Sequence, residues 1–433
     1  MDRQQNKFDD ILNRISVIFL FFILVYFPFS ELCLHALLSY THLSEAAIFW
    51  LVHFYEPLLI LLFLGYLLKF IAGRTLPKFE KADWLIFAFL LFAILAILCR
   101  FSDLSRGLQG LRFLALPYGI FLLVRLSGYK NPNRLLKAYL LIAVMAAMIG
   151  VVEYLYLPRG YLTDLLQISD FGFGENSLIS IGQATAFLAG PNQLASYLIL
   201  PFFYILHRFI TSKFSAFWDK NIYILFVLAA AIFVTYSRSA LVGVIVATVA
   251  MMLYFFRDRK EKITSIIILF VSLLTLAFVY ALQSGEFVRD IFTHGSSFSQ
   301  HLLATKSAFS AFSAGGFIKI LFGFGVGSAG PAALKLGGII SENYYLQILF
   351  EVGVFGLILF LLFLFYLIKD LWLSSKTLFF AFIALLINAL FLHIFSDNPA
   401  MAVSVFLIIG VVLNLESNDE VRMRNDEQMT KPE

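Results

Sequence analysis

The chain contains many uninterrupted apolar runs, and this feature limits its fold more than any other. A run of about 18 or more apolar residues is long enough to cross a bilayer as a helix. Composition agrees, because 61% of the 433 residues are hydrophobic and 14% are charged, whereas a soluble domain carries about 25% charged residues. The runs lack the ten-residue alternation of an outer-membrane barrel. The sequence therefore predicts an all-α polytopic membrane protein.

Hydropathy predicts about twelve transmembrane helices. Their expected ranges are 15–29, 47–71, 84–98, 108–126, 135–157, 184–206, 222–236, 240–256, 263–282, 344–368, 378–395 and 401–415. Together they define one membrane domain over residues 15–415. A cytoplasmic N-terminus, 1–14, precedes this domain, and a polar, disordered cytoplasmic tail, 416–433, is expected to follow it.

Lys and Arg concentrate in alternate short loops, and this bias predicts the orientation of the chain. The basic loops include 125–137 and 257–262, whereas the other loops are poorer in Lys and Arg, with Arg100 and Arg106 as the main exceptions. Both termini fall on the basic side. We therefore predict that both termini lie in the cytoplasm and that the alternate loops lie outside it.

Two longer segments, 158–183 and 283–343, are expected on the outer side. The second has about 60 residues, far more than the 2–8 usual between packed helices, and loops of this length are usually functional. Apolar residues recur in it at helical spacing, which predicts a short amphipathic helix in this extracytoplasmic loop. They are Phe298, Leu302, Phe309 and Phe312.

Several classes of site find no support in the sequence. The two cysteines, Cys33 and Cys99, are too few for a disulfide framework or a thiolate metal site. His294 and His301 lack neighbouring ligands at metal-site spacing. The net charge of +4 includes no basic tract, so nucleic acid is not an expected partner. We predict neither a metal nor a cofactor.

Arg238 is the first residue that we predict to be catalytic. It stands in "TYSRSALVG", at the expected outer junction of two spans. Arginine beside a membrane segment is expensive and tends to be functional, and its guanidinium offers several donors in a fork that suits phosphate oxygens. The alternative is an interface arginine that extends its charge to water.

Glu342 is the second predicted catalytic residue, and Asn343, a candidate for substrate binding, follows it in "SENYYLQILFEVGVFG". Both precede a long apolar run on the outer side. A carboxylate there can deprotonate or orient a hydroxyl, and an amide can orient one. Helix capping is the structural alternative, because acidic and amide side chains are favoured at helix N-termini.

Three further residues are candidates for substrate binding. Asn192, in "GPNQLASY", offers an amide to hydroxyl groups, although Pro191 and Asn192 also suit the start of a helix. His301 offers a contact for a phosphate or a proton, with a plain surface histidine as the alternative. Arg112 lies near the outer end of its span, where a structural ion pair is the competing role. Glu56, Glu153 and Glu351 are the other charges expected within spans.

The stretch "FGFGVGSAGP", 322–331, has Gly323, Gly325 and Gly327 in alternation. It lacks the Gly-Lys-Ser/Thr ending of a P-loop. Such glycines either turn backbone N–H groups toward a phosphate or form a tight connection.

The order of these motifs resembles the O-antigen polymerase and ligase superfamily. The resemblance rests on "GPNQLASYL", "TYSRSALVGV", "FGFGVGSAGP" and "ENYYLQILFEVGVFGL" in sequence, and it covers residues 190–357. Ligases of this superfamily carry a His-Asn pair where this chain has Glu342-Asn343, and "SSFSQH" before the glycine-rich stretch is similar to polymerases. The resemblance therefore favours a polymerase over a ligase.

The resemblance implies glycosyl transfer on the outer side of a bacterial inner membrane. The implied donor and acceptor are glycans linked to polyprenyl diphosphate, alongside membrane lipid, and a chain-length regulator protein is left open as a partner. Because the diphosphate is already a good leaving group, no metal or nucleotide is expected. The product would be O-antigen, capsule or exopolysaccharide.

The same resemblance suggests roles for the candidate residues. Arg238 would bind the diphosphate with help from Arg112 or His301, and Glu342 would orient or deprotonate the acceptor hydroxyl. Tyr344 would stack on a sugar ring. Arg289, in the long outer loop, is a further substrate-binding candidate, although it lacks the glycine partner of the two-arginine loop pattern of some polymerases.

Three other functions remain open at this stage. An O-antigen ligase would transfer the glycan to lipid A–core. A polysaccharide transporter or lipid flippase would have a similar number of spans, but transporters favour broken helices and charges near the membrane midplane. A non-catalytic envelope scaffold would tolerate changes at Arg238 and Glu342.

Overall fold

The computed structural model describes residues 2–41, 43–73, 77, 79–98, 104–157, 183–211, 220–256, 295–331, 333, 338–339 and 341–429. This part of the chain consists of helices and connecting turns, with one isolated β-bridge between Ala329 and Ile339 and no named strand. The predicted all-α class is confirmed.

Eight helical segments in the described residues are long and apolar enough to cross a membrane. One of them is continuous through α1 (Asp2–Tyr26), η1 (Phe27–Phe29) and α2 (Ser30–Tyr40). The others are α4 (Tyr55–Gly73), α5 (Lys81–Leu98), α6 (Leu104–Ser127), α7 (Pro132–Tyr156), α9 (Pro191–Thr211), α11 (Arg238–Phe256) and α17 (Tyr344–Ser374). The chain is therefore a polytopic membrane protein.

Shorter helices complete the described fold. Apolar stretches of 10–17 residues occur in α10 (Lys220–Val234), α18 (Lys376–Asn388) and α20 (Pro399–Met429). The remaining helices are α3 (Glu45–Val52), α14 (Gly295–Ser313), α15 (Gly316–Phe322) and α19 (Ile394–Asp397). The expected span at 263–282 lies outside the described residues, so the count of about twelve spans stays a prediction.

Three predicted segments differ from the structure. The span expected at 47–71 is divided into α3 and α4, because the ring of Pro57 clashes with a helical carbonyl at His53, four residues earlier. The span expected at 184–206 begins as a helix only at Pro191. The tail predicted to be disordered continues α20 as a helix to Met429, since residues 411–429 contain neither Gly nor Pro.

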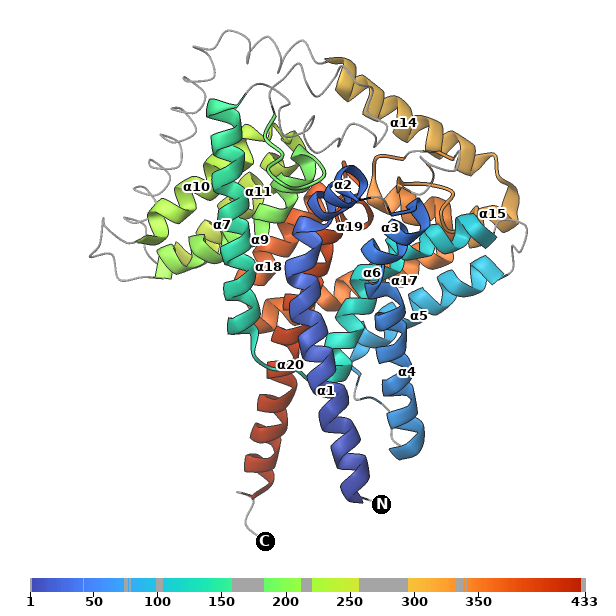
Figure 1. Cartoon of the computed structure of the whole chain (residues 1–433), viewed down its shortest axis with the longest axis vertical. Helices are drawn as coiled ribbons and strands as arrows, with labels where there is room; N and C mark the ends of the chain where they lie inside the picture. Colours follow the sequence, from blue (N-terminus) through green and yellow to red (C-terminus); the bar gives the residue numbers. More distant parts are fainter. Residues whose placement is uncertain are drawn as a thin grey trace.

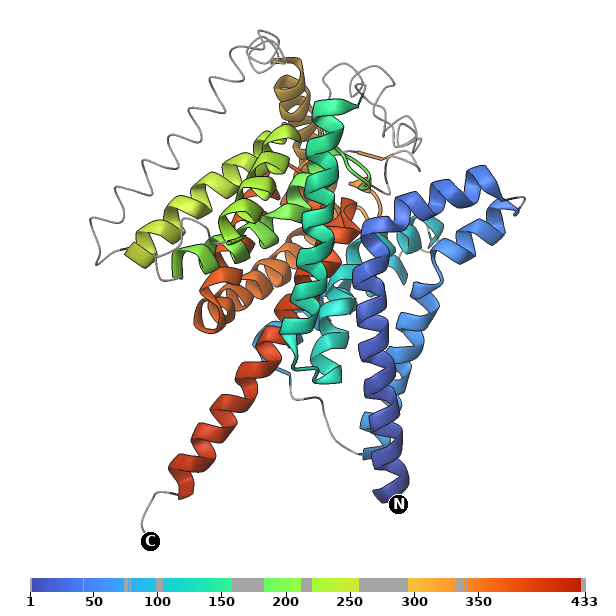
Figure 2. The same ribbon diagram turned by 60° about the vertical axis from the view of Figure 1, so that its left-hand side comes forward.

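The two ends of the helix bundle are distinct. Figures 1 and 2 show both termini at one end and α14 at the opposite end. We call these the terminal end and the α14 end. The helix predicted within 283–343 is present as α14, where Phe312 is buried and Phe309 is exposed. The side chains of Phe298 and Leu302 lie outside the described part.

A buried polar cluster joins three helices at the terminal end. Arg125 of α6 donates from Nε to both carboxylate oxygens of Asp83 in α5, at 3.0 and 3.1 Å. Its Nη1 donates to Asn414 Oδ1 of α20 at 2.9 Å, and its Nη2 lies 3.5 Å from Glu80 Oε1. The Arg125 and Asp83 side chains are only 4% and 1% exposed. This cluster ties the start of α5 to the end of α6.

Helix α17 is interrupted near its start, and the glycine-rich stretch fills the break. Gly353 has φ 71° and ψ −171° within the helix. A break leaves carbonyl groups that need new donors inside a membrane protein. Phe324 N donates to Phe350 O at 2.7 Å, and Gly325 N donates to Glu351 O at 3.0 Å.

We call residues 323–330 the glycine loop. Gly323, Gly325, Gly327 and Gly330 all have positive φ angles. Ala329 N of this loop also donates to Oε1 of the buried Glu351 side chain at 3.3 Å. Of the two readings of this stretch, the structure shows the tight connection, since its N–H groups at 324 and 325 bond to α17.

Replacing Gly323 by alanine is expected to destabilise the protein more than replacing Gly316. Both residues have positive φ, 81° and 76°, which costs about 1–2 kcal/mol for a side-chain residue. A Cβ at Gly323 would also meet the backbone of Glu351 and Gly353, whereas a Cβ at Gly316 meets nothing within 4 Å. The added clash should cost about 1–3 kcal/mol more. Thermal unfolding of both variants in detergent measures the difference, and equal losses would contradict the docking of the loop onto α17.

Candidate functional site

A polar layer lies at the α14 end, where the start of α17 meets the end of α18. Asn343 caps α17, because its Oδ1 accepts from Leu346 N at 2.9 Å. Its Nδ2 donates to Leu390 O at 2.7 Å, and Tyr344 N donates to Ala389 O at 3.0 Å. The first residues of α17 are therefore fixed to the turn that follows α18.

Glu342 stands immediately before this cap. Its side chain is half-buried, its φ angle is 47°, and its backbone N donates to His393 Nε2 at 3.0 Å. The sequence left open whether Glu342 or Asn343 serves as the helix cap. The Asn343 side chain makes the capping bond, so Asn343 and not Glu342 is the cap of α17.

Arg238 lies at the same end of the bundle. It is the first residue of α11, and its side chain is exposed. Helices α11 and α18 are antiparallel, since Gly243 abuts Ala384 near the end of α18 while Tyr254 contacts Phe380 and Lys376 near its start. The start of α11 is therefore beside the end of α18, which is the region that holds residues 342–344.

Helix α14 also reaches this region. Thr305 Oγ1 donates to Ser341 O at 3.4 Å. His301 precedes Thr305 by four residues, which is about one helical turn, so the helix places residue 301 close to the start of α17. The His301 side chain lies outside the described part of the structure, and so does the whole of Arg289.

The start of α9 joins the polar layer through Asn192 and Gln193. Asn192 O accepts from Ser196 Oγ at 2.7 Å, and Ser196 Oγ accepts from Asn388 Nδ2 of α18 at 2.8 Å. Gln193 Nε2 donates to Asp397 Oδ2 at 2.8 Å. The prediction that Pro191 and Asn192 open a helix is confirmed, and any contact of Asn192 with a hydroxyl group stays a prediction.

Two residues of this layer were missed by the sequence analysis, His393 and Asp397. They lie in "LHIFSDNPA", 392–400, where hydropathy extended a transmembrane span to residue 395. In the structure α18 ends at Asn388 and the short α19 covers Ile394–Asp397. The cluster of His, Ser, Asp, Asn and Pro between two apolar runs was the signal that could have identified this polar turn.

Two predicted substrate contacts change role in the structure. Tyr344 is completely buried, its hydroxyl bonds to that of Tyr118 at 2.7 Å, and no ring face is open to a sugar. The prediction that Tyr344 stacks on a sugar ring is therefore wrong. Arg112 forms an ion pair with Glu56 and lies over the ring of Phe49. The structural ion pair, which the sequence left open, is thus the role that the geometry favours.

The other two charges expected within spans also have protein partners. Glu153 of α7 accepts from the backbone N atoms of Thr185 and Ala186, each at 2.8 Å. Glu351 accepts from Gln347 Nε2 at 3.4 Å, and Gln347 Oε1 accepts from Ser396 Oγ at 2.9 Å. These carboxylates connect loops to helices.

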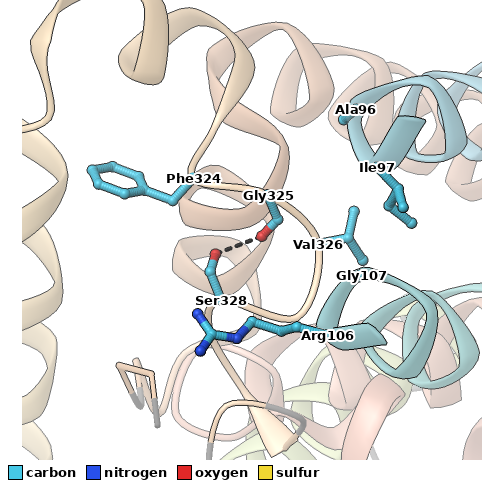
Figure 3. Close-up of a pocket in the computed structure, with 8 residues that line it drawn as sticks. All are labelled: Ala96, Ile97, Arg106, Gly107, Phe324, Gly325, Val326 and Ser328. Atoms are coloured by element: carbon cyan, nitrogen blue, oxygen red, sulfur yellow. Dashed lines mark hydrogen bonds between the residues drawn. The ribbon is translucent and has the colours of Figure 1, made fainter. Parts of the chain in front are cut away.

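A small pocket lies between the glycine loop and the start of α6. Its lining includes Arg106, Phe324 and Ser328, with Ile97 of α5 on the other side. Figure 3 shows the Arg106 side chain extending toward Ser328, whose hydroxyl bonds to Gly325 O. The pocket is partly open to solvent and has room for little more than a water molecule. Arg106 was noted in the sequence only as an exception to the charge bias, and the structure places it beside the glycine loop.

No group of three or more His, Cys, Asp or Glu side chains in the described residues could hold a metal ion. The polar layer instead offers carboxylates, amides, hydroxyls and one imidazole. Such groups can orient hydroxyls and move protons.

Replacing Asp397 by asparagine is expected to raise thermal stability above about pH 6. Asp397 as a whole residue is exposed, but the protein packed around its carboxylate raises the pKa of Asp397 to about 6 from an ordinary 3.8, and the hydrogen bond from Gln193 opposes this shift. The folded state favours the protonated form of Asp397. The contribution of Asp397 to folding stability is therefore complete below pH 3.8 and is lost as the pH rises through 6. Asparagine retains an acceptor for Gln193.

Melting temperatures of the wild type and the Asp397→Asn variant, measured from pH 4 to pH 7.5, test this expectation. The advantage of the variant should grow with pH. Asp10→Asn is the matched control, since Asp10 is 60% exposed beside Arg14. A difference between wild type and Asp397→Asn that is constant across this range would contradict the desolvation of Asp397.

Comparison with protein families gives a match to part of the chain. A family model described as O-antigen ligase matches residues 223–361, from α10 into α17, and this range contains both Arg238 and Glu342. No curated protein matches the chain. Residues 223–361 are therefore similar to the O-antigen ligase family, in agreement with the resemblance carried by the motifs between 190 and 357.

Proposed function

We propose that this protein polymerises lipid-linked oligosaccharide repeat units. The donor and the acceptor are glycans on polyprenyl diphosphate, and the product is O-antigen, capsule or exopolysaccharide. In this proposal the protein lies in the bacterial inner membrane with both termini in the cytoplasm and the α14 end outside. A chain-length regulator is a proposed partner.

One observation carries the proposal: Glu342, which does not make the capping bond of α17, lies at the end of the bundle where α11 begins with Arg238. Asn343 makes the capping bond, and Arg238 is exposed at the start of α11. Both residues fall within the range matched by the family model. Glycosyl transfer from a sugar diphosphate to a hydroxyl needs a cation for the leaving diphosphate and a base for the hydroxyl. The exposed guanidinium of Arg238 and the half-buried carboxylate of Glu342 can fill these two roles.

The proposed reaction has one bond broken and one formed. The bond between the anomeric carbon and the diphosphate oxygen of the donor breaks, and Arg238 stabilises the negative charge that develops on the leaving diphosphate. The acceptor hydroxyl oxygen forms the new glycosidic bond in line with the anomeric carbon. Its proton passes to the Glu342 carboxylate. The products are a longer lipid-linked glycan and free polyprenyl diphosphate.

An O-antigen ligase is the second candidate, and the description of the matched family favours it. A ligase would use the same donor chemistry but pass the glycan to lipid A–core. The superfamily's ligases place histidine where this chain has Glu342, and for this reason we prefer the polymerase.

The break in α17 is a feature that transporters also have. Broken helices in transporters offer free backbone groups to substrate or ions. Here the carbonyls at 350 and 351 accept hydrogen bonds from the glycine loop. The break therefore attaches this loop to α17, and it adds no support for a transporter.

Surface polysaccharide from a strain lacking this protein distinguishes the two enzymes. A polymerase predicts that the gel ladder collapses to a single repeat unit, whereas a ligase predicts loss of the single-unit band as well. Complementation with wild type should restore the ladder, and complementation with Arg238→Ala should not, with membrane levels of both proteins confirmed by immunoblot. A full ladder in the absence of the protein would contradict both functions.

A further inference from the structure

Glu342 has a backbone conformation that must be held from outside. Its φ angle is 47°, in the left-handed region that costs a residue with a side chain about 1–2 kcal/mol. Such a conformation persists only where the surrounding structure imposes it, and it is common at functional sites. Residue 342 belongs to no helix or strand, so contacts with another segment must supply the constraint.

The turn between α18 and α19 supplies that constraint. It bonds to the three consecutive residues 342–344, through His393 Nε2, Leu390 O and Ala389 O in that order. Two of these acceptors are backbone carbonyls, which any sequence would offer. The bond to Glu342 depends on a side chain, and therefore on the identity of residue 393.

The backbone of His393 is itself fixed. Its backbone carbonyl accepts from Ser396 N at 2.9 Å and from Asp397 N at 2.8 Å, which begins α19. Gln193 of α9 in turn bonds to Asp397. The imidazole thus belongs to a turn that follows α18 and is hydrogen-bonded to α9.

The direction of the bond defines the state of the ring. Glu342 N–H is a donor, so His393 Nε2 must be the unprotonated nitrogen and Nδ1 must carry the proton. The Nε2 lone pair is occupied by this bond. A general base would need that lone pair for the substrate, so this arrangement gives His393 a role through Glu342.

We infer that His393 is a positioning residue for Glu342. Its neutral imidazole holds the amide of Glu342, keeps residue 342 in the left-handed conformation, and so directs the carboxylate toward the acceptor hydroxyl. This inference rests on the proposed function of Glu342.

Two substitutions separate hydrogen bonding from packing. His393→Gln keeps an acceptor oxygen at similar reach, whereas His393→Phe keeps a ring without an acceptor. With purified protein and polyprenyl-diphosphate-linked repeat units, the Gln variant should keep a rate within about threefold of wild type, and the Phe variant should lose about 10- to 100-fold, as expected for a misplaced catalytic group. His393→Leu repeats the test without an aromatic ring. A Phe or Leu variant with wild-type rate, or a Gln variant that loses as much as Phe, would overturn the inference.

A second readout does not depend on the reaction. Glu342→Cys is introduced into a chain whose own cysteines, Cys33 and Cys99, are replaced by serine, and its rate of reaction with a water-soluble maleimide is measured. The rate should rise at least about threefold when His393→Phe frees the backbone and should stay unchanged with His393→Gln. Unchanged rates in both variants would overturn the inference. If the thiol rates follow this pattern while Glu342→Gln retains full activity, the positioning holds and the proposed role of Glu342 fails.

Discussion

Replacing Glu342 by glutamine is expected to lower the rate of glycan chain extension by about 100-fold or more. Glutamine retains the shape of the side chain but cannot take a proton from the acceptor hydroxyl. The backbone bond to His393 and the cap made by Asn343 do not involve the Glu342 carboxylate. The variant should therefore fold normally and bind its substrates. The rate is measured as polyprenyl diphosphate released by purified protein under saturating donor and acceptor.

The control for this prediction is Asp10→Asn, which removes a carboxylate near the N-terminus. Asp10 is exposed at the terminal end and pairs with Arg14. It should leave the rate of extension unchanged. A Glu342→Gln variant that extends chains as fast as Asp10→Asn would remove Glu342 from the chemistry.

Replacing Arg125 by alanine is expected to destabilise the fold by about 3–5 kcal/mol, the cost of leaving a buried charge without its partner. Asp83 is 1% exposed and receives two hydrogen bonds from the guanidinium. The substitution also removes the bond to Asn414, which links α6 to α20. Unfolding in mixed detergent and dodecyl sulfate micelles measures the loss.

Arg14→Ala is the matched comparison, because Arg14 forms an ion pair with Asp10 and the two side chains are 75% and 60% exposed. Exposed pairs of this kind contribute about 0–1 kcal/mol. Similar losses for Arg125→Ala and Arg14→Ala would show that the cluster at the terminal end is not a buried ion pair.

Hydropathy predicted the helices because a bilayer imposes both their length and their composition. The predicted class and most of the long spans follow from this single constraint. The hydropathy prediction failed where a few polar residues separate two helices. His393, Ser396 and Asp397 lie within ten residues of two apolar runs, and averaging over a window of about 19 residues conceals them.

The candidate site was predictable only in part, for a different reason. Arg238 and Glu342 were found because each is a polar residue beside an apolar run. Their neighbours depend on contacts between distant segments, such as Glu342 with His393 and Arg112 with Glu56. Without such contacts the sequence could not decide between a helix cap and a catalytic carboxylate, or between a substrate ligand and an ion pair.

The glycine loop shows the same limit. Alternating glycines indicated a special backbone, and both readings required positive φ angles. Only the break at Gly353, which opens carbonyls at 350 and 351, shows what the loop bonds to. Helix-breaking at this glycine was not visible in a run whose composition is otherwise that of a continuous transmembrane helix.

The central claim is that Arg238 and Glu342 act on the same transition state, and a double-mutant cycle on the extension rate tests it most directly. Purified wild type, Arg238→Ala, Glu342→Gln and the double variant are compared with polyprenyl-diphosphate-linked repeat units. Groups that act together give strongly non-additive losses, so the double variant should be hardly slower than the slower single variant. Losses that multiply in the double variant, or single variants that extend chains at the wild-type rate, would contradict the claim.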